Sequence, residues 1–197
     1  MAKQNKTKPN TLRIIGGQWR GRRLGFPDVT GLRPTPDRVR ETVFNWLQTV
    51  IPGAYCLDCC AGSGALGFEA ASRGALHVDM VEPDRLAFQQ LQTNASQLQA
   101  ATCELHQMTA QQFIAKCTKP YDVVFLDPPY QAALWTPLAQ LLSEHNLLKP
   151  QARIYLECGS KQDMPELPAD WQLFKDKVAG DVRYCLFNRI TGKQSDN

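Results

Sequence analysis

From residue 54 onward, the chain alternates short apolar runs with longer segments whose apolar residues recur every three or four positions. A short apolar run between turn residues is typical of a buried parallel strand, and the longer spacing is typical of a helix with one apolar face. The runs predict strands over residues 54–58, 76–82, 102–107, 121–126 and 152–158. The spaced segments predict helices over residues 64–73, 84–99, 109–117 and 132–148. This alternation predicts an α/β fold with an open, doubly wound and mostly parallel sheet.

The two ends of the chain follow other patterns. Residues 171–178 and 182–190 are β-like and flank a Gly-Asp turn, which predicts an antiparallel hairpin that completes a seven-stranded sheet. Residues 11–26 predict a small β-hairpin around Gly16-Gly17. After a proline-rich start, apolar residues at 39, 43, 46, 47 and 50 predict a helix over 38–50.

These patterns divide the chain into three parts. Residues 1–10 are polar and basic, and we expect a disordered tail. Residues 11–34 form the hairpin extension, and residues 35–192 form the main domain. A chain of 197 residues is long enough for one such domain with a sizeable core.

Composition places the chain among ordinary water-soluble proteins. It is 43% hydrophobic and 21% charged, no apolar run approaches 18 residues, and the start lacks the apolar core of a secretory signal. The seven cysteines are an odd number, and most lie in apolar segments, so we expect reduced thiols in a cytoplasmic protein. Cys56-x-x-Cys59 has a zinc-like spacing, but no second pair completes four ligands, and we expect no metal. A monomer is the expected state.

Positive charge gathers at the front of the chain. Residues 1–50 contain ten Lys/Arg and three Asp/Glu, a net charge of +7, whereas the remainder has a net charge of −4. A basic front on an acidic body suggests a polyanionic partner that meets one face. Within residues 11–26, arginines alternate with a tryptophan, which suits phosphate contacts plus stacking on a base. The candidate RNA-binding residues are Arg13, Trp19, Arg20, Arg22 and Arg23.

A glycine-rich loop follows the first strand of the main domain. Gly62-x-Gly64-x-x-Gly67 matches the dinucleotide fingerprint, in which glycines allow a tight turn and close approach of a ligand to a helix N-terminus. Glu82 ends the next strand, where a carboxylate can accept both hydroxyls of an adenosine ribose. NAD and other adenosine cofactors fit equally well at this point.

Asp58 favours one of these cofactors. It stands at the strand end, four residues before Gly62. An anion there disfavours a pyrophosphate and suits the ammonium of an amino-acid group, such as the one in S-adenosylmethionine (SAM). The alternatives are that Asp58 only caps the turn and that Glu82 is a solvated carboxylate at a strand end.

Asp127-Pro128-Pro129-Tyr130 directly follows the predicted strand 121–126. Open α/β sheets bind ligands at the carboxyl ends of their strands. The two prolines fix two φ angles and remove two backbone donors, leaving rigid carbonyls beside a carboxylate and an aromatic ring. We expect Asp127 and the Pro128 carbonyl to accept from an exocyclic amine of a nucleobase while Tyr130 stacks on the base. The alternative is a proline turn that merely ends the strand.

Taken together, these stretches resemble the class I SAM-dependent methyltransferases that act on amino groups. Two N-terminal stretches narrow the resemblance to the RsmD family, the bacterial 16S rRNA (guanine(966)-N(2))-methyltransferases. They are RIIGGQWRGR at residues 13–22 and LRPTPDRVRETVFNWL at residues 32–47. The resemblance implies a Rossmann-like fold, SAM as cofactor, and a guanine N2 amine in 16S rRNA as the target, within an assembled or assembling small ribosomal subunit.

The resemblance also implies roles for further residues. Arg38 is expected to reach the SAM carboxylate, and the backbone of Met108 or the hydroxyl of Thr109 to contact the adenine. The chain departs from the common motifs where Cys60 replaces a glycine and where Thr109 replaces an Asp or Asn. His77 and His106 are expected to be sheet residues rather than bases.

Three other functions compete with this one. An N6-adenine methyltransferase uses the same Pro-Pro motif, but its DNA-acting members usually have a target-recognition domain that this chain lacks room for. An NAD-dependent oxidoreductase leaves Asp58 and the Pro-Pro loop unexplained. A catalytically idle RNA-binding module does not require an intact Asp127.

Overall fold

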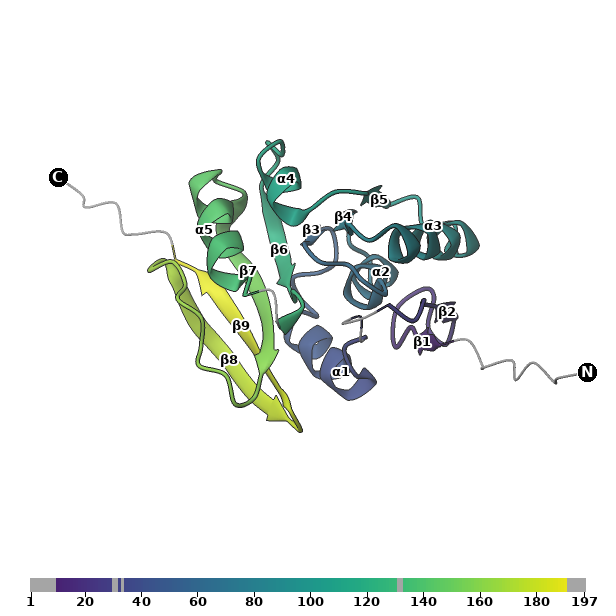
Figure 1. The fold of residues 1–197 in the computed structure, drawn as a ribbon, viewed down its shortest axis with the longest axis horizontal. Coiled ribbons are helices and arrows are strands. Elements are labelled where there is room, and N and C mark those ends of the chain that lie inside the picture. Colours follow the sequence, from purple (N-terminus) through teal and green to yellow (C-terminus); the bar gives the residue numbers. More distant parts are fainter. Residues whose placement is uncertain (1–9, 30–31, 33, 131–132, 191–197) are drawn as a thin grey trace, which may run out of the picture.

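The computed structural model describes residues 10–29, 32, 34–130 and 133–190. Its centre is a seven-stranded sheet (Figure 1). The strands, in spatial order, are β5 (Cys103–His106), β4 (His77–Val81), β3 (Tyr55–Asp58), β6 (Tyr121–Leu126), β7 (Leu148–Gly159), β9 (Val182–Arg189) and β8 (Trp171–Ala179). All pairs from β5 to β7 are parallel, whereas β9 runs antiparallel to both β7 and β8. The predicted Rossmann-like sheet with a C-terminal antiparallel hairpin is therefore confirmed.

Five helices are described, and they lie on both faces of the sheet (Figure 1). They are α1 (Asp37–Trp46), α2 (Ala65–Ser72), α3 (Arg85–Leu98), α4 (Ala110–Ile114) and α5 (Trp135–Glu144). One core cluster joins α1, α2 and α3 to the sheet, and a second joins α4 and α5 to the opposite face. A sheet covered on both faces requires strands that are apolar on both sides, which is why β6 reads as a continuous apolar run.

The strand order reverses between β3 and β6. The chain moves outward from β3 to β4 and β5, then returns to β6 and moves outward on the other side. Such a switch point leaves a crevice beyond the carboxyl ends of the two central strands. The glycine loop follows β3 and the Asp-Pro-Pro-Tyr loop follows β6, so the fold brings both to this crevice.

The N-terminal hairpin consists of β1 (Thr11–Arg13) and β2 (Arg23–Gly25). It is tied to α2 by Glu69, whose buried carboxylate accepts from the backbone N–H groups of Ile15 and Gly16, both at 2.8 Å. The buried Arg40 of α1 donates to the Arg13 carbonyl. The predicted extension is therefore packed on the main domain.

Several predicted boundaries differ from the structure. The helix predicted over 109–117 ends at Ile114, and the one predicted over 132–148 runs only from Trp135 to Glu144. Asn146 adopts a left-handed φ of 54°, which ends that helix and lets β7 begin at Leu148. The predicted tail at 1–10 lies outside the described residues except for Asn10.

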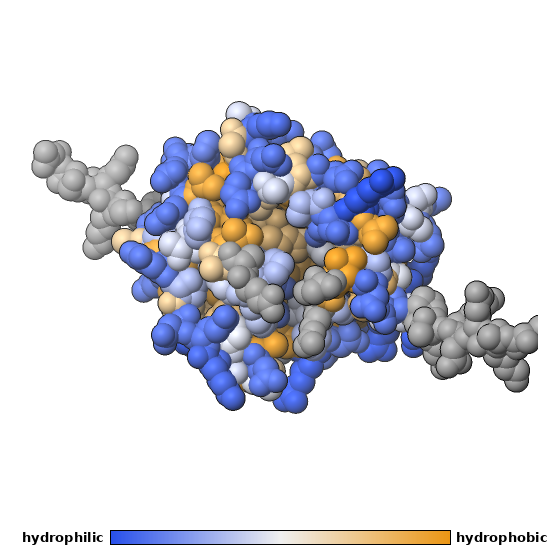
Figure 2. All heavy atoms as spheres, viewed as in Figure 1, coloured by the Kyte–Doolittle hydropathy of each residue, from blue (hydrophilic) through white to orange (hydrophobic). Residues whose placement is uncertain are grey.

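The surface is mainly hydrophilic on the face shown in Figure 2, with hydrophobic residues in smaller groups between polar ones. Among the described residues, no helix is long and apolar enough to cross a membrane. The seven cysteines are free thiols, and four of them are buried. Burial raises the pKa of the Cys103 thiol to about 12, which keeps it protonated and unreactive at neutral pH.

Candidate active site

Four carboxylates lie at the carboxyl ends of neighbouring strands. Asp58 ends β3, Glu82 follows β4, Asp127 follows β6, and Glu157 lies near the end of β7. Leu126 of β6 pairs with Leu156 of β7, so Asp127 and Glu157 are the next residues of two parallel strands in register. The sequence predicted the first three of these carboxylates.

The glycine loop wraps the N-terminus of α2. Gly62 and Gly64 have φ values of 50° and 79°, a left-handed backbone that favours glycine. A Cβ on Gly67 would lie 2.7 Å from the Met80 side chain, so this third glycine lets α2 pack closely on β4. The loop therefore has the backbone geometry that a ligand at a helix N-terminus requires.

Asp58 and Glu82 hold this loop in place. Asp58 Oδ2 accepts from the Gly67 N–H at 3.0 Å, and Glu82 accepts from the N–H groups of Gly62 and Asp84, both at 2.8 Å. Burial raises the pKa of Asp58 to about 7, and it also raises the pKa of Glu82. Asp58 therefore caps the turn, as the alternative interpretation held, and within the described part of the chain no basic side chain forms an ion pair with this buried carboxylate.

Asp127 lies in the same buried region. Its Oδ2 accepts from the Thr35 hydroxyl at 3.3 Å. Burial, followed by the negative charges of Glu157 and Asp58, raises the pKa of Asp127 well above its usual range. Burial also raises the pKa of Glu157. Two neighbouring carboxylates that are largely shielded from water ionise together only at a high cost, which is why the negative charge of Glu157 raises the pKa of Asp127.

Tyr130 is oriented by Glu157. Its hydroxyl donates to Glu157 Oε1 at 3.0 Å, and its ring lies 6.1 Å from the ring of Trp135. The hydroxyl of Tyr155 donates to the other oxygen of Glu157 at 2.7 Å. The ring of Tyr130 is half-buried, so part of it remains available to a base.

Thr35 and Glu157 are the two residues of this site that the sequence reasoning missed. Glu157 is a single carboxylate within the apolar run 152–158, and a charged residue there signals a buried polar role. Thr35 lies between two prolines, which fix its backbone beside Asp127.

The residues expected near the adenine have other partners. Thr109 is the N-cap of α4: its hydroxyl accepts from the Gln112 N–H, and its own N–H donates to the Gln112 side chain. Met108 is half-buried and packs against the second core cluster. The Met108 N–H donates to the His106 carbonyl at 3.1 Å, so both groups named for the adenine contact already have partners within the protein, and the contact stays a prediction.

Arg38 and the arginines of the extension lie on the surface. Arg13, Arg20, Arg22, Arg23 and Arg38 are all exposed. Arg13 forms an ion pair with Asp37 at 3.3 Å, and Arg22 donates to the carbonyl of Gln97 in α3 at 2.9 Å. Exposed guanidinium groups on one small hairpin are consistent with phosphate contacts.

Trp19 does not have the position expected of it. Its side chain is only 9% exposed and belongs to the first core cluster, while its backbone N–H donates to the Ser72 hydroxyl at 2.9 Å. The prediction that Trp19 stacks on a base is therefore wrong for this structure. An apolar ring is worth more in the core of a small extension than in solvent, and here it fixes the hairpin to α2.

A family model described as Conserved hypothetical protein 95 matches residues 12–188. The ribosomal RNA small subunit methyltransferase D of Escherichia coli K12 is 46% identical over 196 residues, which cover 100% of this chain and 99% of the relative. The chain belongs to the RsmD family. A family member from Haemophilus influenzae is 42% identical and covers 93% of this chain and 97% of its own length.

Solved structures agree with this family assignment. A putative methyltransferase, yhhF, from Escherichia coli superposes with a TM-score of 0.85 at 44% identity, covering 92% of this chain and 99% of its own. An RNA methyltransferase of Salinibacter ruber in complex with S-adenosylhomocysteine shares the fold, with a TM-score of 0.62, 15% identity, and coverage of 83% and 98%. As an RsmD-family protein, the chain is a SAM-dependent methyltransferase enzyme.

Proposed function

We propose that this RsmD-family protein transfers a methyl group from SAM to the exocyclic N2 amine of a guanine in 16S rRNA, at position 966 by family resemblance. The observation that carries the proposal is the meeting of Asp58, Glu82 and Asp127 at one switch point, on the loops where the family motifs place them. The relatives named ribosomal RNA small subunit methyltransferase D support the RNA substrate. We propose the cytoplasm as its location, because that is where bacterial ribosomal RNA is assembled.

The residues present fit SAM. The cofactor supplies a methyl group on a positively charged sulfur, and it also carries an ammonium. Asp58 is a buried carboxylate with no ion-pair partner among the described residues, and the left-handed glycines allow close backbone approach. Glu82 keeps lone pairs for ribose hydroxyls while it holds the loop. Met108 borders the adenine side, and Arg38 is the proposed partner of the cofactor's carboxylate.

Asp127 and the Pro128 carbonyl then position the amine. Their oxygens accept hydrogen bonds from the two N–H groups of the amine. This draws the nitrogen lone pair out of conjugation with the base and directs it toward the methyl group. The nitrogen–carbon bond forms as the carbon–sulfur bond breaks, and the nitrogen loses a proton afterwards. Asp127, which already accepts from that amine, is the group in place to take this proton. The protein contributes mainly positioning and electrostatics.

Tyr130, held by Glu157, provides the surface for the base, which is splayed out of its RNA context. The exposed Arg13, Arg20, Arg22 and Arg23 are proposed to contact phosphates, and the assembled or assembling small subunit is the proposed substrate. A monomer is the proposed form.

The test is transfer of labelled methyl from SAM to small ribosomal subunits that lack the native methylation, followed by nucleoside analysis. Labelled N2-methylguanosine is the expected product. Labelled N6-methyladenosine would replace this function with the adenine alternative. Absence of label from every nucleoside, with SAM binding intact, would overturn the RNA substrate.

A further inference from the structure

A second group of chemically active side chains, which the proposed methyl transfer does not use, lies on β4 and β5. His77 and Asp79 are two residues apart on β4, so their side chains lie on the same face of the strand. Asp79 pairs in register with Glu104 of β5. His106 lies two residues beyond Glu104 on the same face. These four residues, the β4–β5 cluster, line a pocket of about 280 Å³, which is also lined by Cys117 and by Met108, the proposed neighbour of the adenine. None of the four cluster residues has a part in the proposed methyl transfer.

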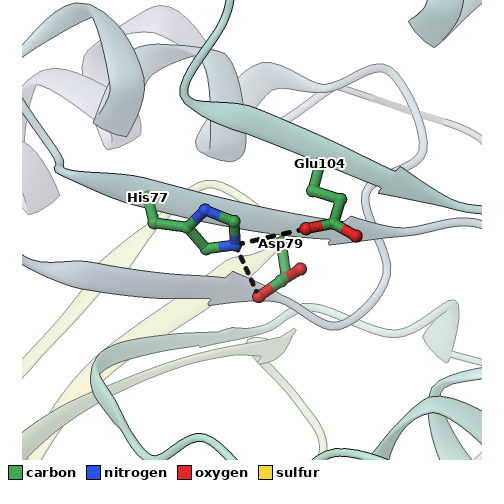
Figure 3. A group of neighbouring side chains, drawn as sticks. All are labelled: His77, Asp79 and Glu104. Carbon is green, nitrogen blue, oxygen red and sulfur yellow. Dashed lines mark hydrogen bonds and ion pairs between the residues drawn. The ribbon is translucent and has the colours of Figure 1, made fainter.

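Three of the four side chains converge on one point, as Figure 3 shows. His77 Nε2 lies 3.0 Å from Asp79 Oδ2 and 3.8 Å from Glu104 Oε2. The ligand atoms of the three residues lie within 4.8 Å of one another. Bonds of about 2.0–2.1 Å to a tetrahedral zinc ion place its ligands roughly 3.3–3.5 Å apart. Small side-chain rotations would therefore bring all three to bonding distance.

The buried ligand of this group is already oriented by neighbours. His106 Nε2 lies 2.6 Å from Asp79 Oδ1, and the Tyr121 hydroxyl donates to Asp79 Oδ2 at 2.7 Å. Outer contacts of this kind fix a metal-binding carboxylate and raise metal affinity. The Asp79 side chain is 7% exposed and that of Glu104 is 61% exposed, which leaves an open path for an ion.

The charges favour a cation over an anion. Two carboxylates face the His77 nitrogen, whereas Lys116 and Lys119, which also line the pocket, are exposed at its rim. A phosphate at this point would meet Asp79 and Glu104 directly. One imidazole with two carboxylates suits zinc and related divalent transition metals better than calcium or magnesium.

We propose that the β4–β5 cluster binds one divalent transition-metal ion of the zinc type. His77, Asp79 and Glu104 are the ligands, and the fourth position is open to water. His106 and Tyr121 orient Asp79. The ion joins edge strand β5 to β4 and so stabilises the sheet near the segment that leads to Met108. The sequence did not predict this site because its ligands come from two strands that are 25 residues apart and contain no Cys pair.

The test is equilibrium dialysis of the intact protein against Zn²⁺, with the absorption spectrum of the Co²⁺ form as a second readout. We expect one ion per chain, a Co²⁺ spectrum of four-coordinate type, and no competition from millimolar Mg²⁺. Glu104→Gln, a change at an exposed side chain, should weaken binding at least about tenfold, and His77→Ala should weaken it further.

His145→Ala, at an exposed histidine beyond α5, is the matched control and should bind as the unmodified protein does. Cys117→Ser tests whether a thiol holds the ion. Unchanged affinity in Glu104→Gln and His77→Ala would overturn the proposal. Loss of binding in Cys117→Ser alone, or less than one ion per chain at saturation, would overturn it as well.

Discussion

At the scale of single residues, the site is defined by four carboxylates, three buried and one half-buried, none of which forms an ion pair with a residue that the structure describes. Asp58, Glu82, Asp127 and Glu157 all have raised pKa values, chiefly because burial disfavours their charged forms. A cationic cofactor and a hydrogen-bond-donating amine each relieve part of that cost. The free-energy cost of burying these carboxylates is present in the free site and is offset when ligands bind.

Asp58 gives this account a pH dependence. A cofactor ammonium binds the ionised carboxylate, and the pKa of Asp58 in the free protein is about 7. Below pH 7 binding must first remove a proton, so the Kd of S-adenosylhomocysteine should rise as pH falls, toward a limit of about tenfold per pH unit. Calorimetric titration between pH 5.5 and 7.5 measures this. Asp58→Asn should bind more weakly at pH 7.5 and show a flatter profile, whereas an unaltered profile would remove Asp58 from the cofactor site.

Glu157 and Tyr130 test the positioning of the base. Tyr130→Phe keeps the ring and removes its hydrogen bond to Glu157, and Glu157→Gln removes the charge beside Asp127. Each should lower kcat by about tenfold or more while the affinity for S-adenosylhomocysteine stays unchanged, because neither residue borders the cofactor loop. Steady-state methyl transfer measures both effects. Glu144→Gln, at the exposed end of α5, is the control, and kcat values equal to it would exclude a positioning role.

Sequence patterns predict some of these residues and not others. Asp58, Glu82 and Asp127 are predictable because each follows its own apolar strand directly. The buried position of Glu157 is signalled by the apolar run around it, but its place beside Asp127 is not, because that depends on β7 lying beside β6 in a fixed register. Trp19 was misplaced for the same reason, since the helix that covers it lies 53 residues further along the chain.

At the scale of elements, α1 links the hairpin to the reacting centre. Arg40 donates to the carbonyls of Arg13 and Thr35, and the Thr35 hydroxyl donates to Asp127. The Arg40 guanidinium also lies 3.5 Å from the buried Glu69. A short series of contacts therefore runs from β1 through α1 to the proposed acceptor of the amine.

Arg40→Met should break this link. Removing one partner of a buried ion pair leaves the other charge poorly compensated, which typically costs about 3–5 kcal/mol. Because Arg73 still pairs with Glu69, we expect the free energy of unfolding to fall by about 3 kcal/mol, the lower end of this range. Urea denaturation measures it. Arg38→Met, at an exposed position of the same helix, should change stability by less than about 0.5 kcal/mol, and equal effects of the two would refute the special role of Arg40.

The elements themselves were largely predictable. The strand–helix alternation and both hairpins followed from apolar spacing and glycine turns. The ends of α4, α5 and β7 did not, because left-handed residues such as Asn146 and pairing across the sheet decide where a periodic segment stops.

At the scale of the whole molecule, charge is divided between the basic front and the acidic body. The hairpin presents its arginines outward and is fixed beside α2 and α3. A cationic patch on a rigid extension suits binding to folded RNA, with the acidic crevice kept for the cationic cofactor.

Replacing Arg20, Arg22 and Arg23 by alanine tests this division. If each contacts a phosphate, the slope of log K against log salt should become shallower by about 2. Binding of rRNA fragments over a salt series measures the slope. Replacing Lys175 and Lys177 by alanine removes positive charge from edge strand β8 and should leave the slope nearly unchanged. An identical slope in the arginine variant would disprove phosphate contact by the hairpin.

The measurement that tests the central claim most directly separates transfer from cofactor binding in Asp127→Asn. If Asp127 positions the amine, methyl transfer to small ribosomal subunits should fall by about a hundredfold or more, because one of the two acceptors of the amine is impaired. The Kd of S-adenosylhomocysteine should remain within about threefold, since Asp58 and Glu82 still hold the cofactor loop. Transfer that continues at the original rate, or transfer and binding that fall together, would contradict the account.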